Sequence, residues 1–187
     1  MSKNKNSKTF EIALSGISCA VAALALSLGI MTGLGALTAT GYLIAVIALM
    51  VPLSKQFFWG DFLAYIGTVI LAVVLGAAVK FWDLVPFAIF FGLHPLANAL
   101  QIRFKINRWL AFAIKAVWFD CTLIVGYYLV FGGLLGGSIL PENFYEILNK
   151  YIFLFIFTVG TVGFFVYDFL IFKCQILINR IVFRIKK

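Results

Sequence analysis

The chain has 187 residues, of which 64% are hydrophobic and only 12% are charged. An ordinary soluble domain is about a quarter charged, and after folding it still exposes roughly a third of its unfolded surface. The polar side chains are too few to cover such a surface, so the composition excludes a soluble globular domain and a disordered chain. It predicts an all-α polytopic membrane protein, since six helical spans need about 20 residues each.

We expect one membrane domain over residues 1–187, built as a six-transmembrane-helix bundle. No charge occurs in the 43 residues from Ile12 to Ser54, so this run must fold back, and the glycines of Thr32–Gly35 permit the turn. A short polar and aromatic loop is expected at 80–83 and a longer outer loop at 132–150. The expected spans are about 10–31, 36–53, 57–79, 84–100, 109–131 and 151–172, followed by a basic cytoplasmic tail at 173–187.

The basic residues indicate the orientation of these spans. Cytoplasmic loops carry an excess of Lys and Arg. With both termini in the cytoplasm, 13 of the 15 basic residues lie on the inner side, and only Lys80 and Lys150 lie outside. A count of five or seven spans would move a basic cluster outside. The charge of +8 is thus explained by membrane topology, and we expect no nucleic-acid partner.

Catalytic and metal-binding motifs are missing from the sequence. Its three cysteines, Cys19, Cys121 and Cys174, lie in or beside apolar segments and form no CxxC pair. The single histidine precedes a proline and has no carboxylate on the same turn, which makes a poor metal site. Neither HExxH nor GxSxG occurs. We therefore expect no enzymatic activity, no metal site and no cofactor.

Small residues form a stripe along the first span. Ser15, Cys19 and Ala23 recur every four residues, with Gly16 and Ala20 beside them. Small residues at this spacing let transmembrane helices approach closely, and van der Waals packing then holds the helices together. Two interpretations stay open: packing within the chain's own bundle, or docking against another membrane subunit.

A polar row is predicted in the fourth span. His94, Asn98 and Gln101 have the spacing of one helix face, and Pro95 is expected to kink the helix. Polar groups in hydrocarbon usually point inward. The row is either an interhelical hydrogen-bond cluster or a polar wall near a substrate cavity.

The charged residues that are candidates for burial within the predicted spans are Asp61, Lys115, Asp120 and Asp168. We expect Asp61 and Asp168 to reach cytoplasmic water or to pair with Lys115 or Arg103. Asp120 lies about half-way along its span, where a carboxylate is expected to be protonated or paired. One face of the last span could line an interior and carries Thr158, Thr161, Phe165 and Asp168.

Polar and aromatic residues also gather at the predicted outer side. Trp82 and Asp83 lie in one expected loop, Tyr127 lies near the outer end of a span, and Asn143 lies in the long glycine-bearing loop. Aromatic residues at this depth usually form the interfacial belt. Loops of this length are alternatively often binding loops or lids.

In length, helix count, orientation, small-residue first helix and glycine-bearing outer loop, the chain resembles the substrate-binding S component of energy-coupling factor (ECF) transporters. The segment from Pro52 to Gly76 is similar to that family's helix 2–3 region. The resemblance implies a subunit of the bacterial plasma membrane that captures a vitamin-like solute and works with a transmembrane coupling subunit and two cytoplasmic ATPases.

The resemblance also implies residue roles. Docking to the coupling subunit would use Gly16 and Ala20, or Ser15, Cys19 and Ala23. The implied solute site, near the outer face, comprises Trp82, Asp83, Tyr127 and Asn143, with His94 and Asn98 deeper. The alternatives are a stand-alone secondary transporter or channel, and a membrane scaffold or assembly subunit.

Overall fold

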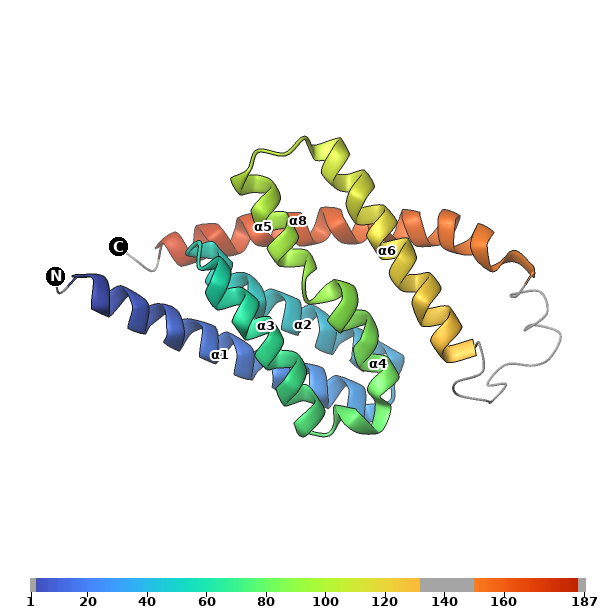
Figure 1. The fold of residues 1–187 in the computed structure, drawn as a ribbon, viewed down its shortest axis with the longest axis horizontal. Helices are drawn as coiled ribbons and strands as arrows, with labels where there is room; N and C mark the ends of the chain where they lie inside the picture. The colour runs from blue at the N-terminus through green and yellow to red at the C-terminus, as the bar shows by residue number, and fades with distance from the viewer. Residues whose placement is uncertain (1–2, 132–149, 185–187) are drawn as a thin grey trace. The chain divides into compact units, whose positions relative to one another are not determined.

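The computed structural model describes residues 3–131 and 150–184. Every regular element within these ranges is helical, which confirms the all-α expectation (Figure 1). The elements are α1 (Lys3–Thr32), α2 (Gly35–Ser54), α3 (Phe58–Val74), the 3₁₀ helix η1 (Ala77–Lys80), α4 (Phe81–Pro86), the π-helix η2 (Phe87–Phe91), α5 (His94–Arg103), α6 (Arg108–Phe131), the π-helix η3 (Ile156–Gly160) and α8 (Thr161–Arg184).

The chain divides into two compact units. The first comprises Met1–Lys105 together with Ile171–Lys187, and the second comprises Ile106–Leu170. The second unit therefore holds α6, η3 and the first part of α8, while the rest of α8 belongs to the first unit.

Five helical segments in the described residues are long and apolar enough to cross a membrane: Lys8–Thr32, Gly35–Ser54, Ala77–Arg103, Arg108–Tyr128 and Lys150–Val182. Their surfaces remain strongly apolar after folding, as the exposed Ile17, Leu24 and Leu28 of α1 illustrate. Lipid tails can cover such apolar faces. In water the same faces would be exposed as hydrophobic patches larger than soluble monomers usually carry. These segments are those of a multi-pass membrane protein. α3, of 17 residues, is apolar but shorter.

The first unit is built around a close helical hairpin. α1 ends at Thr32 and α2 begins at Gly35, so the turn lies where the two glycines predict it, and Gly33 has a φ of 68°. The hairpin is tight because glycines face each other: a Cβ added at Gly41 would lie 2.6 Å from the backbone oxygen of Ala25 and 3.3 Å from the Cα of Gly29. α3 also packs against α1 (Figure 1).

The prediction of a loop at 80–83 is wrong, because these residues are helical. The break occurs earlier, at Gly76, whose φ of 117° favours glycine. η1 and α4 follow at once, so Trp82 and Asp83 lie in the first turn of α4. Pro86 lacks the N–H of a regular helix, and the widened turns of η2 follow it directly.

Pro95 does not kink a continuous helix, contrary to expectation. The helix is interrupted at Gly92–Leu93, and α5 begins anew at His94 with the proline in its first turn. A first-turn proline loses no helical hydrogen bond, because N–H groups at that position have no partner within the helix.

Aromatic stacking fills the second unit. The ring of Phe164 lies 5.4 Å from those of both Phe112 and Phe119, in stacked geometry. α6 begins at Arg108, and the side-chain oxygen of Asn107 caps it by accepting a 2.9 Å hydrogen bond from the Trp109 N–H. α8 continues to Arg184, so the expected basic tail is helical as far as that residue.

Candidate functional site

The polar row of α5 points inward as its spacing predicts. His94 and Asn98 are fully buried and Gln101 is 8% exposed. The His94 ring packs 5.2 Å from the ring of Phe90. α5 packs against α2 and α3, so these imidazole and amide groups lie inside the first unit. Buried polar side chains in an otherwise apolar chain are costly and are associated with substrate paths or interhelical hydrogen bonds.

Two tyrosine hydroxyls of the first unit form hydrogen bonds to the backbone of α4 and η2, the segments that precede α5. The Tyr42 hydroxyl of α2 donates to the backbone oxygen of Asp83, and the Tyr65 hydroxyl of α3 donates to that of Ala88. The widened helical turns around Pro86 are thus held from two sides. Asp83 contributes its backbone to this arrangement while its side chain is exposed, and Trp82 is half-buried.

The small-residue stripe of α1 is divided between two faces. Ser15 and Ala23 are buried and Cys19 is half-buried, on the face towards α3. There the Thr68 hydroxyl donates to the Cys19 carbonyl at 3.4 Å, and a Cβ added at Gly67 would lie 2.8 Å from the Cys19 sulfur. This face is thus partly filled by packing against α3, although Ser15 and Cys19 also line a pocket next to it.

Gly16 and Ala20 are exposed instead. A Cβ built on Gly16 has no atom within 4 Å among the described residues. Beside it lies a pocket of about 310 Å³, whose lining includes Glu11, Gly16, Trp59 and Leu63. Of the predicted docking residues, Gly16 and Ala20 are the exposed pair, and small residues at such positions allow close approach by another helix.

The second unit holds a buried ion pair. The Lys115 ammonium donates to the Asp168 carboxylate, with the two residues 6% and 8% exposed. Of the partners expected for Asp168, Lys115 is thus confirmed. Asp61, in the first unit, is only 1% exposed, so its carboxylate is enclosed and does not reach water as expected.

Asp120 lies deeper along α6 and has a polar neighbour on α8. The Thr161 hydroxyl donates to Asp120 Oδ2 at 3.3 Å, while Oδ1 has no hydrogen-bond partner among the described residues. Thr158, predicted on the same face as Thr161, instead donates to its own helix at the Leu154 carbonyl, 2.6 Å away. The expected polar face of the last span is therefore only partly turned towards α6.

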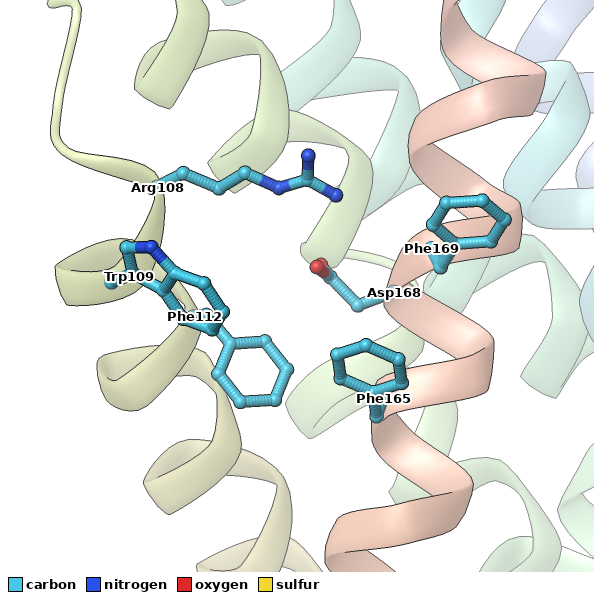
Figure 2. A pocket seen from close by; sticks show the side chains of 6 residues that line it. All are labelled: Arg108, Trp109, Phe112, Phe165, Asp168 and Phe169. Carbon is cyan, nitrogen blue, oxygen red and sulfur yellow. The ribbon is translucent and has the colours of Figure 1, made fainter.

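A pocket of about 430 Å³ lies between α6 and α8 within the second unit. Figure 2 shows the Arg108 guanidinium and the Asp168 carboxylate directed into the same space, above a wall of aromatic rings. The pocket is lined by Arg108, Trp109, Phe112, Phe165, Asp168 and Phe169.

Helical spacing predicts Phe165 and Asp168 on one interior face, but it does not predict the other four lining residues. The sequence does contain a pattern that could have indicated them, because Arg108, Trp109 and Phe112 share one side of the first turns of α6. Basic and aromatic residues at a span end are, however, typical of any membrane interface.

The predicted solute-site residues are distributed over both units. Trp82, Asp83, His94 and Asn98 belong to the first unit, in which the tryptophan opens α4 and the buried row lies on α5. Tyr127 belongs to α6 of the second unit and is half-buried. Asn143 and the expected loop at 132–149 lie outside the described residues. The joint solute site stays a prediction.

Comparison with known proteins finds no matching family model, no matching curated protein and no matching solved structure. The function must accordingly be inferred from the chemistry of the side chains.

Proposed function

We propose that the chain is a membrane subunit that captures a small solute, as the S component of an ECF-type importer does, and passes it on with a coupling subunit and two ATPases. The buried row of His94, Asn98 and Gln101 carries the proposal. An imidazole and two amides can hydrogen-bond a polar solute inside an apolar helix bundle. A vitamin-like organic solute suits such groups, since among the described residues no cluster of His, Cys, Asp and Glu can hold a metal ion.

The proposal includes six spans with both termini in the cytoplasm. α3 would be the additional span: its 17 residues rise about 26 Å, close to the roughly 30 Å of hydrocarbon. A slight local thinning of the bilayer accommodates that difference. The exposed Trp59 at its start suits a membrane interface, where tryptophan is enriched.

We predict that single cysteines introduced at Lys55 and Arg103, in a chain whose own cysteines are replaced, resist a membrane-impermeant thiol reagent applied from outside. A cysteine at Asn143 should react, because that residue belongs to an outer loop in the proposed topology. The measurement is labelling of intact cells, with permeabilised cells as the control for reactivity. External labelling at Arg103 would contradict the six-span orientation.

Solute binding is expected to depend on the first unit's polar groups. A thermal-shift screen of the purified chain against water-soluble vitamins and nucleobases should give a stabilising compound. Replacing Asn98 or Trp82 with alanine should weaken its affinity by about tenfold, the effect of losing one buried hydrogen bond or stacking contact. Trp59→Ala is the control for loss of a tryptophan, because this side chain is 76% exposed and is not one of the predicted site residues.

Normal affinity in both Asn98→Ala and Trp82→Ala, with retained folding, would remove the site from this part of the chain. Loss of binding in Asp61→Ala alone would place the site at the first turn of α3.

Partner docking is expected to use the open pair Gly16 and Ala20. Ala20→Trp adds a large side chain to the exposed face of α1 and should abolish co-purification of the ATPases and solute uptake, while solute binding to the isolated chain persists. Ala39→Trp, on an exposed position of α2, controls for added bulk. Unchanged assembly and uptake in Ala20→Trp would assign this face to lipid contact.

A stand-alone secondary transporter is the second candidate, and the second unit favours it. The Lys115–Asp168 pair and Asp120 place ionisable groups inside helices, where such groups often form ion or proton paths. Reconstitution of the chain alone in liposomes separates the two candidates. Solute flux driven by an imposed proton or sodium gradient supports this one, and flux only with added ATPases and ATP supports the first.

A further inference from the structure

The pocket between α6 and α8 has no role in the solute-capture proposal. It lies wholly within the second unit and combines one cationic and one anionic side chain with four aromatic ones (Figure 2). Its volume of about 430 Å³ lies within the usual range for small-ligand sites, roughly 300–1,000 Å³.

The charges of this pocket favour an anion. The Asp168 carboxylate is already bound by the buried Lys115 ammonium. Arg108 is a second cation close to this pair, and its guanidinium is directed into the pocket. The guanidinium is a planar donor fork that matches the oxygens of a phosphate.

The remaining walls favour a ligand with an apolar tail. Phe112 and Phe165 meet edge to face, with their ring centroids 5.6 Å apart, and form the floor. Phe165 and Phe169 are 55% and 44% exposed, so this aromatic surface continues out of the pocket along α8. A soluble anion would leave this surface uncovered, whereas a hydrocarbon chain can lie along it.

The α6 side of the pocket lies at the end of a candidate membrane span. Arg108 is the first residue of the candidate span Arg108–Tyr128. The neighbouring Trp109 is 76% exposed, and tryptophan is enriched at membrane–water interfaces. The sequence predicts this end of the span to be cytoplasmic, which is the leaflet where anionic lipids attract basic residues.

We propose that this pocket is a binding site for an anionic phospholipid. The phosphate is bound by the Arg108 guanidinium, the Lys115–Asp168 pair holds the site open and prevents the carboxylate from repelling the headgroup, and an acyl chain runs over Phe165 and Phe169. This assignment does not depend on the solute or on the partner subunits of the proposed function.

The test is native mass spectrometry of the purified full chain, titrated separately with dioleoylphosphatidylglycerol and dioleoylphosphatidylcholine. The chain should bind phosphatidylglycerol more tightly, and Arg108→Gln should reduce that preference by about tenfold through loss of the charge-assisted contact. Arg108→Lys should retain part of it. Lys105→Gln removes the same charge from a neighbouring exposed residue outside the pocket lining, and it should retain the full preference.

Melting temperatures show whether each variant remains folded. An unchanged preference in folded Arg108→Gln would overturn the proposal, as would equal losses in Arg108→Gln and Lys105→Gln, which indicate diffuse attraction to the basic surface. Displacement of phosphatidylglycerol by millimolar glycerol phosphate would assign the site to a free phosphate instead of a lipid. Weaker binding of both lipids to Phe165→Ala supports the acyl-chain path, and unchanged binding contradicts it.

Discussion

Replacing Lys115 with methionine is expected to lower the free energy of unfolding by about 3–5 kcal/mol, the usual cost of removing one partner from a buried ion pair. Methionine has nearly the volume of the lysine stem, so the change removes the charge without opening a large cavity. The Asp168 carboxylate, 8% exposed, then loses its bonded ammonium while staying enclosed by the aromatic helices. The measurement is unfolding of the purified chain in mixed micelles by increasing denaturing detergent.

A double variant shows whether the cost comes from the unpaired charge. Lys115→Met combined with Asp168→Leu removes both charges, and apolar replacement of a whole buried pair is often neutral or stabilising. It should therefore recover most of the lost stability. Lys8→Met, at an exposed position of α1, should have little effect. A double variant as unstable as Lys115→Met would show that the lysine stem, not its charge, holds the unit together.

Features that depend on local spacing could be predicted from the sequence. The turn at Thr32–Gly35 follows from an uncharged run too long for one span and from glycine at the turn. The inward row of His94, Asn98 and Gln101 follows from helical periodicity, together with the cost of polar groups in lipid. The Lys115–Asp168 pair could be predicted because few basic residues lie near enough to pair with a carboxylate in an apolar span.

Features that depend on tertiary packing could not be predicted. The residues at 80–83 are polar and aromatic, so they resemble a loop, yet the backbone break had already occurred at Gly76 and nothing there prevents a helix. In the small-residue stripe, Ser15 and Gly16 are equivalent by composition. Only the position of α3 decides that Ser15 is buried while Gly16 stays open.

The aromatic pocket illustrates a further limit of sequence reasoning in membrane proteins. In a soluble chain, exposed residues such as Trp109 and Phe165 would indicate a binding surface. In a membrane chain, the same residues are expected wherever a helix meets lipid. What distinguishes this set is the presence of Arg108 and Asp168 in the same space, and that proximity involves two helices separated by a long stretch of chain.

Replacing Gly41 with alanine is expected to destabilise the chain by about 1–3 kcal/mol, the usual cost of overpacking a close interface. The added Cβ would lie 2.6 Å from the Ala25 carbonyl oxygen and 3.3 Å from the Gly29 Cα. Both neighbours are backbone atoms, so no rotation of a side chain can relieve the contact and the helices must separate. Separation would also stretch the 3.1 Å hydrogen bond from the Thr38 hydroxyl to the Gly29 carbonyl.

The matched control is Gly35→Ala on the same helix, where a Cβ has no atom within 4 Å among the described residues. Alanine is a better helix former than glycine by up to about 1 kcal/mol, so this variant should be neutral or slightly more stable. Opposite signs for the two substitutions, measured by thermal unfolding in the same detergent, identify backbone contact as the cause. Equal effects at Gly41 and Gly35 would mean that α1 and α2 are not in close backbone contact at Gly29 and Gly41.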